Sequence, residues 1–301
     1  MKKILILLTA LFMISCSGTP KEQNEKPVLS VSILPQQYFV QQIAGDMFQV
    51  NVMIPPGASP ATYDPSPAQL AALTKTDLYL MMGYTGFEMS WTEKLQSTNP
   101  GMHMVNLSQG IDLIMEKSLH DHNSNQVPDQ TPSHGDGHHH GGIDPHTWLS
   151  PRNVKIICEN LQKALTETYP EHEETFRTNF NAFAVRLDSL DRAISNELEH
   201  VKPVSFFTYH PSLSYYARDY GLTQIPLELM GKTPSASYLR ELVDTGKEKK
   251  IDIVFLQMQF DQHNAEVLAR EIGAEIVQIN PLDPEWFQQI LFITEKLTEK
   301  K

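Results

Sequence analysis

Histidine is concentrated in one short stretch of this chain, where seven of its twelve histidines lie between residues 120 and 146. Neutral imidazole is the side chain that most often binds transition metals in proteins. Six of the seven lie among Gly, Asp, Asn, Ser and Pro, a composition that cannot pack a core and stays mobile. These six are His120, His122, His134, His138, His139 and His140. The stretch therefore predicts a tether that gathers a divalent metal, with zinc as the first choice.

The seventh histidine has different neighbours. His146 follows Asp144-Pro145 and precedes Trp148-Leu149, so a stiff proline and buried apolar side chains should hold its ring in one place. His210 follows the apolar run 204–207 and should emerge at the end of a strand. Either ring could merely satisfy a local hydrogen bond, since a lone histidine is more often structural. Together they are candidates for one metal site.

The first residues have the layout of a secretory leader. Lys2 and Lys3 precede a mostly apolar run, residues 4–14, which is shorter than the ~20 residues that span a bilayer as a helix. Ser15 before Cys16 resembles the cleavage site of bacterial lipoproteins. We therefore predict a signal peptide over 1–15, acylation of Cys16, and a polar tether over 16–27. The alternative is an ordinary cleaved signal with an incidental cysteine. Both place the protein outside the cytoplasmic membrane, in the periplasm or on the cell surface.

The amino-acid composition limits the kinds of partner and of cross-link that we expect for this chain. The formal net charge is −12, which argues against nucleic acid and suits the attraction of cations. Only Cys158 would remain besides Cys16, so no disulfide is expected within the mature chain. Cys158 lies at helical spacing from apolar neighbours and should be a buried small hydrophobe rather than a zinc ligand.

Strand patterns alternate with helix patterns along the mature chain, which predicts βαβ units and parallel sheets. The expected strands cover residues 28–34, 48–54, 77–82, 102–107, 203–208, 222–227, 251–257 and 274–279. A helical stretch without Gly or Pro runs over 171–199. The fold class is therefore α/β, with two lobes that each contain a mostly parallel sheet flanked by helices. We expect an N-terminal lobe over 28–170 with a polar insertion at 108–142, a linking helix over 171–200, and a C-terminal lobe over 201–301.

In open parallel sheets, ligands bind beyond the carboxyl ends of the strands, and between two lobes the cleft is the natural place. Four segments follow strands and combine polar residues with proline: 55–67, the insertion that ends at His146, 208–211 and 278–281. We expect the metal site among them.

At these segments the chain resembles the zinc- and manganese-binding solute-binding proteins that serve bacterial ATP-binding-cassette (ABC) importers, and in particular the high-affinity zinc uptake group. The resemblance rests on Ile-Pro-Pro-Gly-Ala-Ser-Pro at 54–60, the histidine-rich insertion, Asp-Pro-His-Thr-Trp-Leu-Ser-Pro at 144–151, His210, and Asn-Pro-Leu at 280–282. It covers nearly the whole mature chain. It implies a monomer that binds one metal ion between its lobes and delivers it to an ABC permease driven by an ATPase.

Matched residue by residue, the ligand set that this resemblance implies is incomplete. The family's first ligand position holds Ala61, the second and third hold His146 and His210, and the fourth holds Asn280. Histidine at position 210 favours zinc over manganese, because imidazole suits zinc whereas manganese prefers oxygen. Two histidines do not complete a tetrahedral zinc site. The missing donors would come, in order of preference, from a loop histidine (His138, His139 or His140), from water, or from a carboxylate (Glu88, Asp64 or Asp283).

Three other readings of the sequence stay open: a surface metal buffer that works through the histidine-rich loop, a relative whose cleft has moved to another ligand, and a zinc hydrolase with Glu88 as general base. The sequence lacks His-Glu-x-x-His, Gly-x-Ser-x-Gly and a glycine-rich phosphate loop. We therefore predict a binding protein rather than an enzyme.

Overall fold

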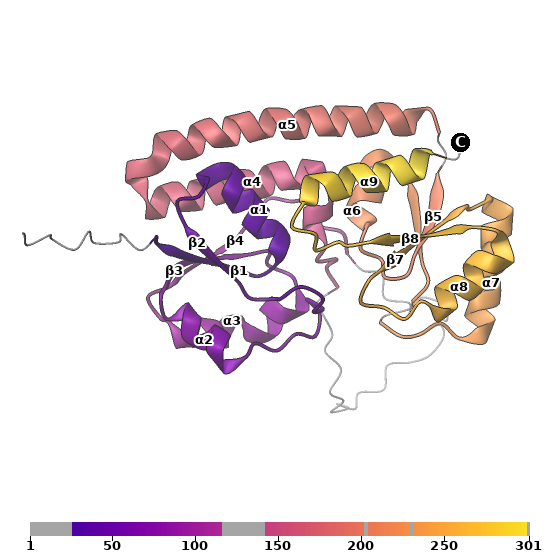
Figure 1. Ribbon diagram of the computed structural model, residues 1–301, viewed down its shortest axis with the longest axis horizontal. Coiled ribbons are helices and arrows are strands. Elements are labelled where there is room, and N and C mark those ends of the chain that lie inside the picture. The colour runs from indigo at the N-terminus through magenta and orange to yellow at the C-terminus, as the bar shows by residue number, and fades with distance from the viewer. Residues whose placement is uncertain (1–25, 116–141, 202–203, 229–230, 300–301) are drawn as a thin grey trace, which may run out of the picture.

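A computed structural model describes residues 26–115, 142–201, 204–228 and 231–299 (Figure 1). The predicted leader, Cys16 and the loop histidines from His120 to His140 lie outside the described residues.

The N-terminal lobe is a parallel four-stranded sheet in the order β2-β1-β3-β4. Its strands are β1 (Val28–Val31), β2 (Gln49–Val52), β3 (Thr76–Met81) and β4 (His103–Asn106). Its helices are α1 (Leu34–Ala44), α2 (Pro67–Leu73) and α3 (Gly86–Thr98). In Figure 1, α2 and α3 lie below the sheet, and α1 lies above it. Side-chain caps start two of these helices, with Ser66 accepting from the Gln69 amide and Thr85 from the Glu88 amide.

The C-terminal lobe repeats the same topology, with the order β6-β5-β7-β8 and parallel pairing throughout. The strands are β5 (Ser205–Thr208), β6 (Thr223–Pro226), β7 (Ile253–Gln257) and β8 (Glu275–Ile279). The helices are α6 (Ser214–Tyr220), α7 (Ala236–Lys249), α8 (His263–Ile272) and α9 (Trp286–Thr298). In each sheet the strand order changes direction around the first strand, β1 or β5, so the carboxyl ends of β1 and β3, and of β5 and β7, flank a crevice.

Two helices connect the lobes. After the short 3₁₀ turn η1 (Thr147–Leu149), α4 (Pro151–Thr168) leads through the turn η2 (Pro170–His172) into α5 (Glu173–Glu199). The helix predicted over 171–199 thus begins two residues later, because Pro170 starts a 3₁₀ turn. In Figure 1, α5 runs along the top of both lobes. Its buried face packs on α1, α4 and α9 and consists of Phe176, Phe183, Leu187, Leu190, Ile194 and Leu198.

One hydrophobic core continues through both lobes, because side chains from both sheets belong to the same buried cluster. Two tryptophans lie where the lobes meet. The Trp148 indole donates to the Pro281 carbonyl (2.8 Å), and the Trp286 indole donates to the Trp148 carbonyl (2.7 Å). Trp286 also packs edge-on against Phe39 of the N-terminal lobe. The base of the cleft is therefore a packed interface.

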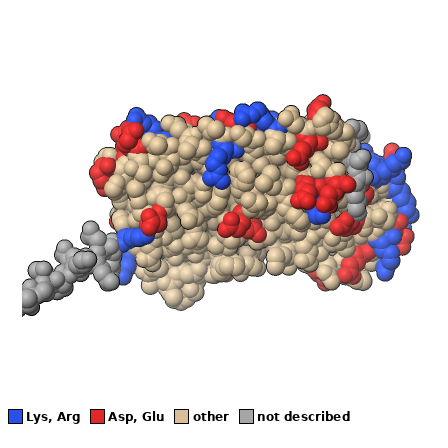
Figure 2. All heavy atoms as spheres, turned by 45° about the horizontal axis from the view of Figure 1, so that its top comes forward, with Lys and Arg blue, Asp and Glu red and all other residues tan. Residues whose placement is uncertain are grey.

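Cys158 of α4 is fully buried in this core, and burial raises the pKa of its thiol well above its usual range. The prediction that it is a small hydrophobe is confirmed. On the face shown in Figure 2, acidic and basic side chains gather mainly toward the two ends, and the area between them is largely uncharged apart from a few charged groups. None of the helices within the described ranges combines the length and the apolar character that a membrane span requires.

The predicted fold class is confirmed: two parallel sheets flanked by helices and joined by a long helix. All eight expected strands form, each within or one residue beside its predicted range. The lobe limits at residues 170 and 200 stay a prediction.

Gly83 provides a test of this fold. Its φ is +103°, and a Cβ there would lie 2.3 Å from the Asn106 side chain. We expect Gly83→Ala to lower the free energy of unfolding by roughly 1–3 kcal/mol, because the backbone is strained and the neighbour must move. Denaturant unfolding measures this. Gly101→Ala, where φ is not positive and the nearest atom is 3.7 Å away, is the control. Equal losses in the two variants would contradict the account.

Candidate metal centre between the lobes

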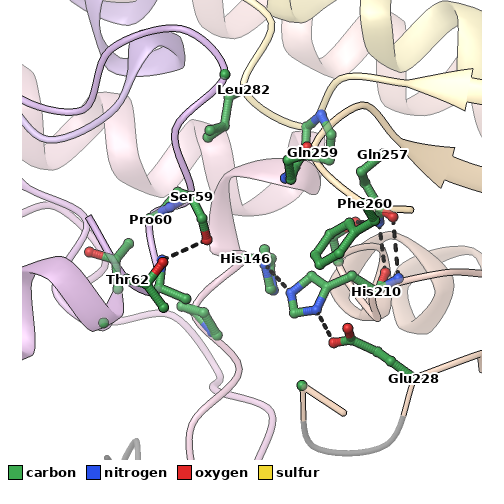
Figure 3. Close-up of a pocket in the computed structure, with 18 of the residues that line it drawn as sticks. Ser59, Pro60, Thr62, His146, His210, Glu228, Gln257, Gln259, Phe260 and Leu282 are labelled. Atoms are coloured by element: carbon green, nitrogen blue, oxygen red, sulfur yellow. Dashed lines mark hydrogen bonds and ion pairs between the residues drawn. The ribbon is translucent and has the colours of Figure 1, made fainter. Parts of the chain in front are cut away.

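A cavity of about 470 Å³ lies between the two lobes, beyond the carboxyl ends of their strands (Figure 3). Its lining comes from the N-terminal lobe, from the segment before α4, and from the C-terminal lobe. The residues are Gly57, Ser59, Pro60, Ala61, Thr62, Thr85, Gly86, Pro145, His146, Trp148, His210, Ser212, Glu228, Gly231, Gln257, Gln259, Phe260, Pro281 and Leu282. The site therefore draws on the segments that the sequence pattern favours.

His146 is held by the residue two positions before it. The Asp144 carboxylate accepts a hydrogen bond from the His146 backbone amide (2.9 Å) and another from His146 Nδ1 (2.8 Å). Burial alone would raise the pKa of Asp144, but the charge and hydrogen bonds of His146 outweigh burial and bring this pKa below its usual value. Asp144 is therefore ionised at neutral pH. The Tyr215 hydroxyl donates to the Asp144 carbonyl (2.8 Å), which ties this turn to α6.

His210 follows β5 and is fixed by the ends of two neighbouring strands. Gln257, at the end of β7, accepts from the His210 amide (3.2 Å) and donates to its carbonyl (2.7 Å). Glu228 follows β6, and its amide donates to the Tyr209 carbonyl (3.1 Å). The Glu228 carboxylate, only 5% exposed, lies 2.5 Å from His210 Nδ1. Strand pairing thus sets the position of this carboxylate relative to the ring.

The two imidazoles face each other across the cleft, with their Nε2 atoms 3.2 Å apart (Figure 3). A carboxylate can only accept, so each Nδ1 donates to the carboxylate behind it and each Nε2 points toward the other ring. Zinc–nitrogen bonds of ~2.0–2.1 Å at a tetrahedral angle place two donors about 3.3 Å apart. The observed separation of 3.2 Å is close to this value.

Aromatic side chains flank the two imidazoles. Trp148 packs against His146 with ring centroids 5.4 Å apart, and Phe260 stacks on His210 at 5.5 Å. In Figure 3, Phe260 and Glu228 lie on different sides of the His210 ring. These walls limit rotation of the rings and reduce the local dielectric, which strengthens bonds to a cation.

The positions that the resemblance gave as first and fourth ligands contribute no donor side chain. Ala61 lines the cavity with a methyl group. Asn280 is absent from the cavity lining, since its side-chain oxygen accepts from the Leu282 amide (3.1 Å) and its amide group points to Asp283. Asn280, which holds the family's fourth ligand position, thus caps the turn after β8 and does not face the cavity.

The prediction that Glu88 could donate an oxygen to the metal or act as a general base in the cleft needs a correction. Glu88 is 1% exposed and absent from the cavity lining. Its oxygens accept from the amides of Met82 (2.7 Å) and Gly83 (2.7 Å), and the Ser32 hydroxyl donates to it as well. Glu88 therefore fills the crevice between β1 and β3, where an open sheet would otherwise offer a ligand site.

The other carboxylates predicted as donors are engaged elsewhere as well. Asp64 accepts from the Trp91 indole (3.0 Å), and Asp283 accepts from the Glu285 amide (2.8 Å). Among residues 26–115, 142–201, 204–228 and 231–299, no three His, Cys, Asp or Glu side chains are grouped to hold a metal. His138, His139 and His140 lie outside the described residues, so their role stays a prediction.

Sequence reasoning missed the two carboxylates behind the histidines. Asp144 enters the prediction only as part of the Asp-Pro-His motif, although an aspartate two residues before a histidine can bond both its amide and its ring. Glu228 has no predicted role. Its signal was available, because it directly follows the expected strand 222–227 and so lies at the same sheet edge as His210.

The sequence profile of the family described as zinc-uptake complex component A, periplasmic (ZnuA), matches residues 29–295. The chain belongs to this family. A zinc-binding lipoprotein, AdcA of Streptococcus pneumoniae, is 32% identical over 295 residues, which cover 94% of this chain and 56% of that protein. The chain thus spans about half the length of this relative.

Solved structures agree with this assignment to the ZnuA family. A crystal structure of ZnuA is 35% identical, with a TM-score of 0.81 and coverage of 91% of this chain and 99% of that one. A ZnuA variant that lacks its residues 138–173 and has zinc bound gives a TM-score of 0.80 at 35% identity, with coverage of 91% and 97%.

The histidine tautomers can be tested in the metal-free protein. We expect ¹⁵N spectra at pH ~8 to show Nδ1–H and unprotonated Nε2 for both His146 and His210, because each Nδ1 donates to a carboxylate. In Glu228→Ala, His210 should revert to the mixture shown by His263, which is exposed on α8. Glu228→Gln keeps an acceptor and should preserve the tautomer. A proton on Nε2 of His210 in the unaltered chain would refute this arrangement.

Proposed function

We propose that this chain captures one zinc ion outside the cytoplasmic membrane and delivers it to the permease of an ABC importer. The observation that carries the proposal is the pair of Nε2 atoms that face each other 3.2 Å apart, a spacing close to that of two nitrogens bound to one zinc ion. Each ring also has a carboxylate behind it, and this arrangement raises the basicity of a zinc-bound histidine.

Imidazole donors favour zinc over manganese, which prefers oxygen. The zinc-bound structure of the ZnuA variant and the name of the streptococcal relative support the same cargo. The permease and its ATPase, monomeric function, and anchoring through acylated Cys16 belong to this proposal. The lipoprotein relative supports the anchor.

A hydrolytic function has less support. Glu88, the predicted general base, is buried against the backbone of the N-terminal lobe and is not part of the cavity lining. Glu228, the carboxylate that does line the cavity, bonds His210 Nδ1 and therefore orients a ligand instead of activating water.

His210→Ala tests the cleft assignment. Removing one of two fixed donors should weaken zinc binding at least about 100-fold, since loss of an outer-shell partner alone typically costs 10–100-fold. Calorimetric zinc titration measures the change. His263→Ala removes an exposed histidine on α8 and should leave the affinity unchanged. An unaltered affinity in His210→Ala would refute the proposal.

Deletion of residues 120–141 separates the roles of the histidine-rich loop. If the loop only gathers metal, the tight site should survive and the number of weak sites should fall. If a loop histidine completes the cleft site, the tight affinity itself should drop sharply. Loss of all zinc binding would mean that the chain is a surface buffer and that the cleft is not the site. Zinc titrations of both proteins, with stoichiometry fitted, distinguish these results.

A further inference from the structure

We infer that the cleft takes zinc as a 1:1 complex with a small bidentate chelator of the α-amino-acid type, bound through an amino nitrogen and a carboxylate oxygen. This inference rests on the proposed function and names its cargo more closely. Three features of the cavity carry it: the number of donors, the volume and the charge of the lining.

The donor count leaves two vacant positions. Zinc takes four donors at tetrahedral angles, and the described lining supplies two imidazole nitrogens. Ala61 lines the same cavity where the family resemblance implies a further histidine. Two adjacent vacancies on one ion match a bidentate chelator, whose nitrogen and oxygen close a five-membered ring with the metal. No bond in the protein or the chelator breaks in this step.

The cavity is far larger than an ion requires. One water accounts for ~30 Å³ of liquid, so two metal-bound waters fill only a small part of about 470 Å³. Cavities of ~300–1,000 Å³ are typical of organic ligands. The walls nearest the imidazoles include Trp148 and Phe260, and Pro60 and Leu282 line the same cavity. Such walls would accommodate the side chain of an amino acid.

The charges that line the cavity determine which class of chelator it can accept. Among the described lining residues, Glu228 is the only acidic one, and Lys and Arg are absent. A polycarboxylate such as citrate would bring excess negative charge without a cation to pair with it. A 1:1 complex of Zn²⁺ with one amino-acid anion is still positively charged, which suits a site where Asp144 and Glu228 each lie behind one imidazole.

The test uses the full mature chain, with zinc and radiolabelled L-leucine as the probe, because L-leucine offers only an amino nitrogen and a carboxylate oxygen. Protein is mixed with equimolar zinc and L-leucine and passed through a desalting column, and both are counted in the protein fraction. We expect one L-leucine per zinc per chain, and no retention of L-leucine without zinc. At fixed free zinc, L-leucine should tighten zinc binding at least about tenfold, because two chelator donors replace two waters.

Three variants make the result specific. Ala61→His adds a protein donor and should lower retained L-leucine at least about tenfold while zinc is kept, since one coordination position is filled. His210→Ala should retain neither, whereas deletion of residues 120–141 should retain both. Zinc held tightly without L-leucine, and stripped when L-leucine is added, would overturn the inference but leave zinc capture intact. Loss of retained L-leucine on loop deletion would also overturn it. No zinc bound under either condition would overturn the proposed function itself.

Discussion

One geometric condition underlies the site: the Nε2 atoms of His146 and His210, one from each side of the cleft, face each other 3.2 Å apart. Asp144 and Glu228 impose this condition, because each fixes the Nδ1 proton of one ring and turns Nε2 toward the other. Backbone contacts hold both carboxylates in place: Tyr215 bonds the Asp144 carbonyl, and the Glu228 amide extends the pairing of β5 with β6. The affinity of the cleft for a cation is therefore built into the paired strand ends and the turn before α4.

The two lobes share one topology but use it differently. In the C-terminal lobe, the crevice between β5 and β7 holds His210, clamped at both backbone atoms by Gln257. In the N-terminal lobe, Glu88 closes the corresponding crevice between β1 and β3 by accepting from Met82 and Gly83. A buried carboxylate needs such donors, since an unsatisfied one would be costly. The site is consequently asymmetric, and the N-terminal sheet contributes walls rather than donors.

The sequence predicted the elements well because their signals are local: apolar runs, proline and glycine boundaries, and a helical stripe over 171–199. It also predicted His146 and His210, which follow a stiff turn and a strand end. The prediction of site residues failed where the role of a side chain depends on contacts with residues distant in sequence. The prediction of Glu88 as a metal ligand was wrong because its neighbours in sequence do not reveal that it is buried against the ends of β1 and β3. Glu228 was missed because its importance comes from lying beside His210, 18 residues earlier.

The packed base of the cleft limits how cargo can leave. Separating the lobes as independent bodies would expose Trp148 and Trp286 and break both indole hydrogen bonds. Each bond contributes about 1 kcal/mol, and each buried aromatic side chain adds roughly 2 kcal/mol or more. His210, in contrast, follows the end of β5, and its side chain is 29% exposed, compared with 13% for His146. An N–N spacing above ~4.2 Å cannot be bridged by one zinc with bonds of ~2.1 Å. A local shift of about 1 Å at His210 would therefore break the bridge of the proposed zinc ion while the lobes stay packed.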